Sequence, residues 1–189
     1  TLIAMAMQDG HIASLDQTAE MFAPQFAGTA YGQTTLRHLL MMSAGVDFEE
    51  DYNAPGSDIR RLFLGANIYG QNIDSLVAEI ERDRPAGQDL HYVSANTHVL
   101  SAVIRGIYNA PLAEVVEMKI WRPLGMTGDA SWNQNIQGDN GMAIGYCCLN
   151  ARLEDYARMG QFYLQDGVWH GERLLPEGWV TMATRPNAS

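Results

Sequence analysis

Residues 85–97 read Pro-Ala-Gly-Gln-Asp-Leu-His-Tyr-Val-Ser-Ala-Asn-Thr and lead from a turn directly into the most apolar part of the chain. Proline disfavours helix in the residue before it, so the helix preceding this turn is expected to end near Arg84. Residues 93–108 then repeat apolar side chains at helical spacing and predict a buried helix, whose stripe is Leu100, Val103, Ile104 and Ile107. Junctions between turns and helices present side chains into clefts, which makes Tyr92 and Ser94 candidates for a site.

Helix signals dominate the rest of the sequence, because apolar residues recur at intervals of three and four rather than two. In the first half of the chain we expect a helix in progress over 1–7, a short helix over 34–40 capped by Thr34 or Thr35, and a helix from Asp74 to Arg84 capped by Asp74. In the second half we expect a helix over 111–121 opened by Pro111, a helix over 151–165 capped by Asn150, a hairpin over 168–175 and a short helix from Pro176. The inner side of the helix over 151–165 is expected to carry Leu153, Tyr156, Ala157 and Leu164. Residues 129–145 are rich in Asn, Gln, Gly and Asp and predict an exposed loop.

The charge and hydropathy of the chain exclude two kinds of partner. Lys and Arg number 12 against 22 Asp and Glu, which gives a net charge of −10 and a surface that repels nucleic-acid phosphates and anionic lipids. No apolar run approaches the roughly 20 residues of a membrane span. We therefore expect no nucleic-acid partner and no membrane span.

Both ends of the sequence predict a longer chain. Residues 1–7 have no initiator Met and no capping residue before the apolar run. Residues 184–189 are turn-forming types after which a further strand is expected.

No complete catalytic or metal motif is present in this sequence. None of the five histidines has metal-ligand spacing with a carboxylate, and surface or packing roles are expected for His91 and His98. The sequence has no Gly-x-Ser-x-Gly elbow and no phosphate-binding glycine motif. Cys147 and Cys148 are adjacent, which does not fit ordinary disulfide geometry, and two sulfurs alone make no zinc site. We therefore expect no metal and no cofactor.

Tyr92 and Ser94 each admit two interpretations from the residues alone. A phenol acts as acid or base only where a cation lowers its pKa from about 10, and Lys119, the only lysine, is far away in sequence. Tyr92 would otherwise be a structural aromatic with one hydrogen bond. Ser94 would otherwise be the N-cap of the helix that follows.

Five segments, taken in order, resemble one family: residues 34–46, 85–97, 121–127, 147–164 and 166–180. They are similar to the serine β-lactamase-related, penicillin-binding-protein-like hydrolases, a group that includes class C β-lactamases, D-alanyl-D-alanine carboxypeptidases, β-lactamase-like esterases and 6-aminohexanoate-dimer hydrolases. The Tyr-x-Ser sequence at Tyr92 and Ser94 resembles the last two most. The resemblance implies an α+β fold of the β-lactamase/transpeptidase type, of which residues 1–189 are one incomplete domain, mainly helical with short hairpins.

The resemblance also implies acyl-transfer chemistry. In this family a Ser-x-x-Lys motif supplies the nucleophile and its base, Tyr-x-Asn or Tyr-x-Ser relays a proton, and a Lys/His-x-Gly strand forms the far wall of the site. Only the second motif is present here, which gives Tyr92 the catalytic role. No serine in this sequence is followed three places later by lysine, so Ser-x-x-Lys is expected upstream of Thr1 and Lys/His-x-Gly beyond Ser189.

Three residues are expected to bind the substrate. Ser94 stands where β-lactamases have asparagine. Asparagine offers a substrate amide both a donor and an acceptor, whereas serine offers only a short hydroxyl, so efficient β-lactam hydrolysis is not expected. Trp132 is expected either to form a wall of the acyl or alcohol pocket or to be a surface anchor. Tyr146 lies where the family brings the chain toward the cleft. The alternative is that the segment of Tyr146, Cys147 and Cys148 is simply buried as small apolar residues in the core.

The function predicted from these features is that of a serine hydrolase of small esters or amides, active through an acyl-enzyme, with this chain inactive alone. Two alternatives stay open at this point: a non-catalytic β-lactamase-like module that binds peptidoglycan-like or acylated ligands, and a helical interaction domain with accidental similarity. An upstream Ser-x-x-Lys motif would favour the hydrolase.

Overall fold

The computed structural model describes residues 1–185, so the turn expected over 184–189 lies mostly outside the described residues. Its elements in chain order are α1 (Leu2–Gln8), η1 (Ala19–Met21), η2 (Pro24–Phe26), α2 (Leu36–Leu40), α3 (Asp58–Asn67), α4 (Ile73–Ala78), α5 (Ser94–Tyr108), α6 (Leu112–Val116), η3 (Glu117–Trp121), β1 (Ser131–Trp132), β2 (Leu149–Asn150), α7 (Leu153–Leu164), β3 (Val168–Trp169), β4 (Glu172–Arg173) and α8 (Trp179–Thr184). The described part of the chain is mostly helical with short strands, as the α+β expectation requires.

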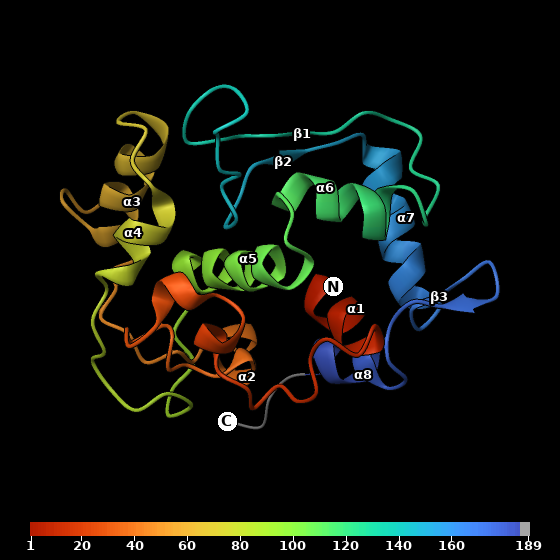
Figure 1. Ribbon diagram of the computed structural model, residues 1–189, viewed down its shortest axis with the longest axis horizontal. Coiled ribbons are helices and arrows are strands. Elements are labelled where there is room, and N and C mark those ends of the chain that lie inside the picture. Colours follow the sequence, from red (N-terminus) through yellow and green to blue (C-terminus); the bar gives the residue numbers. More distant parts are fainter. Residues whose placement is uncertain (186–189) are drawn as a thin grey trace.

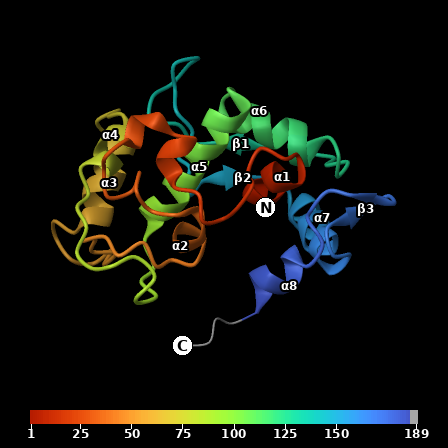
Figure 2. The same cartoon turned by 60° about the horizontal axis from the view of Figure 1, so that its bottom comes forward.

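Helix α5 lies at the centre of the structure (Figures 1 and 2). It contacts α1, α2, α4, α6 and η1, and most of its residues are buried. The η1 helix approaches it closely at Gly106, where an added Cβ would collide with the carbonyl group of Phe22. A helix buried on nearly every side holds its first residues rigidly, and those residues are the Tyr-x-Ser segment.

Several predicted elements are confirmed. Thr35 caps α2 by accepting a hydrogen bond from the His38 amide over 3.3 Å. Helix α6 begins after Pro111 and continues through η3 to Trp121, before Arg122 and Pro123. The hairpin of β3 and β4 turns at His170 and Gly171, whose φ angles of 50° and 84° match the left-handed conformation that two-residue hairpin turns require.

Short strands also order the loop that follows η3. β1 pairs antiparallel with β2, with Ser131 opposite Asn150 and Trp132 opposite Leu149. This pairing closes the long loop between the two strands, as the ribbon above α5 and α6 shows (Figure 1). The loop predicted over 129–145 is therefore anchored at both ends.

Several local predictions are wrong. Helix α4 ends at Ala78, six residues before the predicted end at Arg84. Helix α4 is capped by Asn72, whose side chain accepts from the Ser75 amide, and Asp74 is one of its buried residues. Asn150 lies in β2, so that α7 begins at Leu153 with Arg152 as its N-cap.

The face of α7 is also rotated from the predicted one. Leu153 and Leu164 are exposed, and the buried side chains of this helix are Asp155 and Phe162. Asp155 faces inward because its carboxylate accepts hydrogen bonds from the amides of Thr127 and Gly128, over 2.8 and 3.0 Å. A carboxylate bound to backbone amides has outweighed the apolar pattern of the helix.

Within residues 1–185, no single helix is long and apolar enough to cross a bilayer. The consecutive helical segments Ser94–Tyr108 and Leu112–Trp121 are long and apolar enough only when taken together, and the chain bends by 77° between them.

Candidate active site

The Tyr-x-Ser segment occupies the entry to α5. Val93 is the N-cap in extended conformation and is buried, whereas Tyr92 before it is 55% exposed. Ser94 is the first helical residue and is buried. The phenol of Tyr92 is thus displayed at the surface, and the Ser94 hydroxyl lies just beneath it.

Glu50 binds Ser94 through both carboxylate oxygens. The Ser94 amide donates to Oε2 over 2.9 Å, and the Ser94 hydroxyl makes a short hydrogen bond to Oε1. The Tyr52 hydroxyl donates to the same Oε1 over 3.0 Å. An anion is well placed here, because the first amides of a helix lack partners within the helix and carry the positive end of its dipole. The Ser94 side chain is therefore not an N-cap, and that interpretation is wrong.

The loop that carries Glu50 is fixed by a neighbour of Tyr92. His91 bonds through Nε2 to the carbonyl oxygen of Phe48 over 3.0 Å, and its amide donates to the carbonyl oxygen of Met42 over 2.7 Å. His91 thus has the packing role predicted for it. Sequence reasoning missed Glu50 and Tyr52, although the run Glu49-Glu50-Asp51-Tyr52 in a loop before the Tyr-x-Ser segment was visible.

The same cluster includes Tyr146. Burial raises the pKa of Tyr146 to about 12, and the negative charges of Tyr52 and Glu50 add to the rise. The Tyr146 hydroxyl is buried and has no hydrogen-bond partner within residues 1–185.

Tyr92 belongs to this electrostatic neighbourhood as well. The neighbouring Ser94 side chain lowers the pKa of Tyr52, but burial and Glu50, with a contribution from Tyr92, outweigh that effect and raise it overall. Ser94 and Tyr52 are therefore joined at Glu50, Tyr92 lies exposed two residues before Ser94, and Tyr146 packs against His98 of the same helix.

Trp132 serves a neighbouring apolar cavity. Its indole Nε1 donates to the carbonyl oxygens of Ile144 and Cys147, over 3.0 and 2.7 Å, and so braces the segment that carries Tyr146. Its ring lines a cavity of about 520 Å³ together with Met42, Thr97 and Gly145, whereas Tyr92, Ser94 and Tyr146 are outside that lining. Trp132 therefore lines a pocket and also anchors the loop. The polar residues around Glu50 do not line this pocket.

Cys147 and Cys148 form a disulfide between adjacent residues. Their Cα atoms are 3.7 Å apart, closer than in ordinary disulfides, as expected for adjacent residues. Cys148 has a φ of 75°, a left-handed conformation, and this backbone lets the two side chains meet. The pair directly follows Tyr146 and precedes β2.

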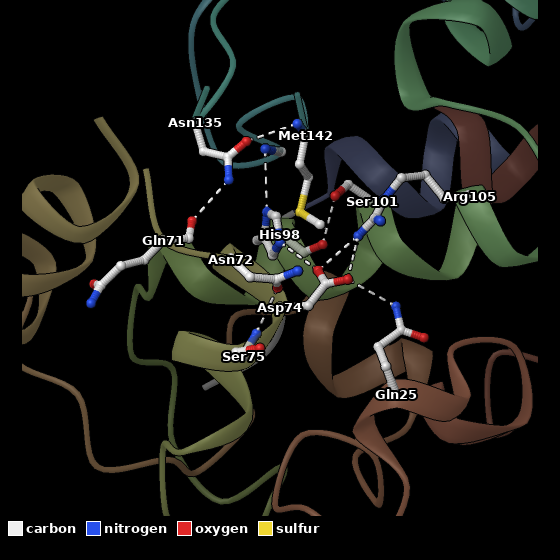
Figure 3. Close-up of polar contacts among 11 residues, drawn as sticks. Gln25, Gln71, Asn72, Asp74, Ser75, His98, Ser101, Arg105, Asn135 and Met142 are labelled. Carbon is white, nitrogen blue, oxygen red and sulfur yellow. Dashed lines mark hydrogen bonds and ion pairs between the residues drawn. The ribbon is translucent and has the colours of Figure 1, made fainter. Parts of the chain in front are cut away.

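A second polar cluster lies beneath the first, on the same helix. His98 and Arg105 of α5 both contact Asp74 of α4, with His98 Nε2 at 2.8 Å from Oδ1 (Figure 3). The prediction of a packing role for His98 missed this carboxylate, which is 24 residues away in sequence. No local sequence signal indicated the pairing, since Asp74 had the spacing of a helix cap.

The only lysine of the chain is elsewhere. Lys119 pairs with the carboxylate of Asp9, and its ammonium lies 5.2 Å from the ring centroid of Tyr108. Within residues 1–185 no group of three or more His, Cys, Asp or Glu side chains is arranged to hold a metal ion. The cation that would activate Tyr92 is therefore not supplied by Lys119.

Comparison with known proteins identifies the family of this chain. A sequence profile of the β-lactamase family matches residues 1–188, and the chain belongs to that family. The 6-aminohexanoate-dimer hydrolase of Paenarthrobacter ureafaciens is 27% identical over 186 residues, which are 95% of this chain and 46% of that protein.

Solved structures agree with this assignment. A Bacillus anthracis protein provisionally named as a 6-aminohexanoate-dimer hydrolase is 25% identical with a TM-score of 0.81, over 96% of this chain and 48% of that one. A class C β-lactamase from Rhodobacter sphaeroides is 18% identical with a TM-score of 0.60, over 96% of this chain and 51% of that one. This chain spans about half the length of the relatives that it matches.

Proposed function

We propose that this chain contributes the Tyr-x-Ser side of a serine hydrolase that cleaves esters or linear amides through an acyl-enzyme. The observation that carries the proposal is the anchoring of the Tyr-x-Ser segment at the entry to α5, where Glu50 binds Ser94 and Tyr52 while the Tyr92 side chain is exposed. We take the reaction class from the family, because the relatives to which this chain is similar include 6-aminohexanoate-dimer hydrolases. The chain covers about half of these relatives, so we propose that residues 1–189 are the mainly helical part of a larger domain.

The reaction divides into two steps. A serine of an upstream Ser-x-x-Lys motif attacks the carbonyl carbon, the carbon–oxygen or carbon–nitrogen bond of the substrate breaks, and the serine proton passes to the leaving alcohol or amine. Water then attacks the acyl carbon, the bond between that carbon and the serine oxygen breaks, a proton of the water passes to the serine, and the carboxylic acid leaves. The Tyr92 phenol relays the proton in both steps, with a lysine sharing the charge, and no metal or cofactor takes part.

The Ser94–Glu50 contact favours esters and linear amides over cephalosporins. The hydroxyl of Ser94 already donates to Glu50, so it offers a substrate only the lone pairs of its oxygen. An asparagine amide at the same place would offer both a donor and an acceptor. Tyr146 and Trp132 would either contact the substrate or form part of the wall of the pocket that holds it.

The test uses the intact protein that contains this chain. A p-nitrophenyl ester of a short fatty acid and the linear dimer of 6-aminohexanoate are offered as substrates, and intact-mass spectrometry of quenched samples measures the acyl adduct. We expect turnover and an adduct on the serine of Ser-x-x-Lys. An intact protein that lacks this motif and binds acylated or peptidoglycan-like ligands without turnover would instead be a binding module.

A further inference from the structure

His98 is bonded through both ring nitrogens. Its side chain is fully buried on α5, one turn after Ser94. The Gly145 amide donates to Nδ1 over 3.3 Å, so Nδ1 is the acceptor and the ring proton is on Nε2. Nε2 donates to Oδ1 of Asp74 over 2.8 Å. Figure 3 shows the ring between Asp74 and the loop that carries Asn135 and Met142.

Asp74 is held in place by further donors. Arg105 Nη2 lies 2.7 and 3.0 Å from its two oxygens, and Gln25 Nε2 donates to Oδ2 over 3.1 Å. Burial alone raises the pKa of Asp74, but the His98 hydrogen bond and the Arg105 charge outweigh burial and hold the pKa below its ordinary value. A charged, fully bonded carboxylate fixes the Nε2 proton, and this directs the Nδ1 lone pair at Gly145.

Gly145 joins this cluster to the candidate active site. A Cβ at Gly145 would collide with the Ser101 hydroxyl and would lie 3.1 Å from His98 Nδ1, so only glycine lets the backbone approach α5 this closely. Tyr146 is the next residue, and its ring meets the His98 ring edge-on at a centroid distance of 6.2 Å. Fixing the Gly145 amide therefore fixes Tyr146 against α5.

The other hydrogen bonds of this loop within residues 1–185 do not reach α5. The Asn135 side chain accepts from the Met142 amide over 2.8 Å and donates to the Gln71 carbonyl oxygen over 2.9 Å. These bonds hold the loop to itself and to the segment between α3 and α4. The bond from Gly145 to His98 joins the loop to the helix that carries Ser94.

We propose that His98 is a positioning residue for the hydrolase reaction: its unprotonated Nδ1, directed by Asp74, holds Gly145 and thereby sets Tyr146 against α5, the helix that the Tyr-x-Ser segment leads into. This inference rests on the proposed function. The lone pair on Nδ1 is the essential feature, and the bond to Asp74 serves to direct it.

Protonation of His98 would oppose this arrangement. The charged and titratable groups that face the ring are Asp74 from α4, Arg105 from α5 itself and Tyr146 from the loop. Burial lowers the pKa of His98, although the hydrogen bond to Asp74 and its charge counteract burial. The imidazole is thus neutral at neutral pH, and a second ring proton would point at the Gly145 N–H.

Two substitutions separate the two bonds of His98. His98→Asn places an amide oxygen near the Nδ1 position, where it can accept from Gly145, but it loses the contact with Asp74. His98→Gln places an amide N–H near the Nε2 position, where it can donate to Asp74, but it loses the acceptor for Gly145. The measurements on the intact protein are kcat and KM with an ester, hydrogen exchange of residues 142–148, and the unfolding midpoint.

The proposal predicts opposite orders for activity and stability. We expect His98→Gln to lower kcat by about ten- to a hundredfold with faster exchange at 142–148, because small misplacements of site residues have effects of this size. His98→Asn should keep kcat within about threefold of wild type while unfolding more easily than His98→Gln, because Asp74 loses a partner. The proposal would be overturned if the variant with the lower unfolding midpoint also had the lower kcat, or if the two variants had equal kcat.

A measurement on the unsubstituted protein covers the case in which neither variant folds. Nitrogen-15 NMR of the His98 ring should show protonated Nε2 and unprotonated Nδ1 at pH 7, with a protected Gly145 amide. Protonated Nδ1 would refute the positioning role. Absence of any hydrolase activity in wild type would instead refute the proposed function and leave the ring measurement as it stands.

Discussion

Glu50 binds both the amide and the hydroxyl of Ser94, across 44 residues of sequence. The amide of the first helical residue has no partner within a helix, and here a carboxylate from a distant loop supplies one. The same carboxylate accepts from Tyr52, so one anion orders three donors at the entry to α5. The Tyr-x-Ser segment is therefore shaped by tertiary contacts as well as by its own sequence.

Glu50→Gln should destabilise the protein and lower its activity. The glutamine amide has only one oxygen, so a Ser94 donor is left facing an N–H group. We expect the free energy of unfolding to fall by about 1–3 kcal/mol, the range for a buried donor that loses its partner. Urea unfolding measures the change. Glu49→Gln is the matched control, because Glu49 is exposed and the same charge is removed, and its effect should stay within about 0.5 kcal/mol.

Tyr92→Phe should remove most of the catalytic activity of the intact protein with little effect on stability. The phenol is exposed and its hydroxyl makes no hydrogen bond within residues 1–185, so the fold does not depend on it. Loss of a proton relay typically lowers kcat by about 10²- to 10⁴-fold. Steady-state kinetics with a p-nitrophenyl ester measure the loss. Tyr69→Phe, at another exposed tyrosine, is the control, and equal kcat in both variants would assign Tyr92 a structural role.

The 189-residue chain by itself should not turn over esters. It contains no Ser-x-x-Lys sequence, and its only lysine is bound to Asp9. Release of p-nitrophenol is followed with the purified chain and with the intact protein at equal concentrations. Turnover by the chain alone that survives Tyr92→Phe would contradict the assignment of the nucleophile to an upstream motif.

Ser94→Asn should shift the substrate preference modestly toward cephalosporins. The amide adds a donor that the serine lacks, and one substrate hydrogen bond is worth about 0.5–1.5 kcal/mol, or roughly a few-fold to tenfold in rate. The ratio of kcat/KM for a cephalosporin to that for an ester is measured in both proteins. An unchanged ratio would mean that residue 94 acts only through Glu50, and a wild type that prefers cephalosporins would contradict the ester and amide assignment.

The sequence predicted the elements whose signals are local. Helix α5 carries an apolar stripe over four turns, and the hairpin of β3 and β4 has a glycine at its turn, so both were found with nearly correct bounds. The family was recognised because five segments occur in order, and the profile match over residues 1–188 confirms it.

The polar contacts could not be predicted, because each joins residues far apart in sequence. Asp74 was expected to cap α4, yet it binds His98 and Arg105 of another helix. Asp155 turned α7 away from its apolar pattern by binding the amides of residues 127 and 128. A carboxylate in a helical pattern does not show whether it faces water or a buried donor, and that choice is made by packing.

Acid should destabilise the wild-type protein more than His98→Asn. Burial lowers the pKa of folded His98, so the unfolded chain, with a pKa near 6.5, takes up this proton at higher pH than the folded one. Stability from the neutral ring is therefore fully present above about pH 6.5 and is lost as the pH falls below that value. Asp74, whose pKa is lowered, adds a loss only in the more acidic range below its ordinary pKa. The free energy of unfolding is measured in urea at pH 7 and pH 5 for both proteins. We expect wild type to lose up to about 2 kcal/mol more than His98→Asn over this interval, and equal losses would show that the pKa of His98 is not lowered by folding.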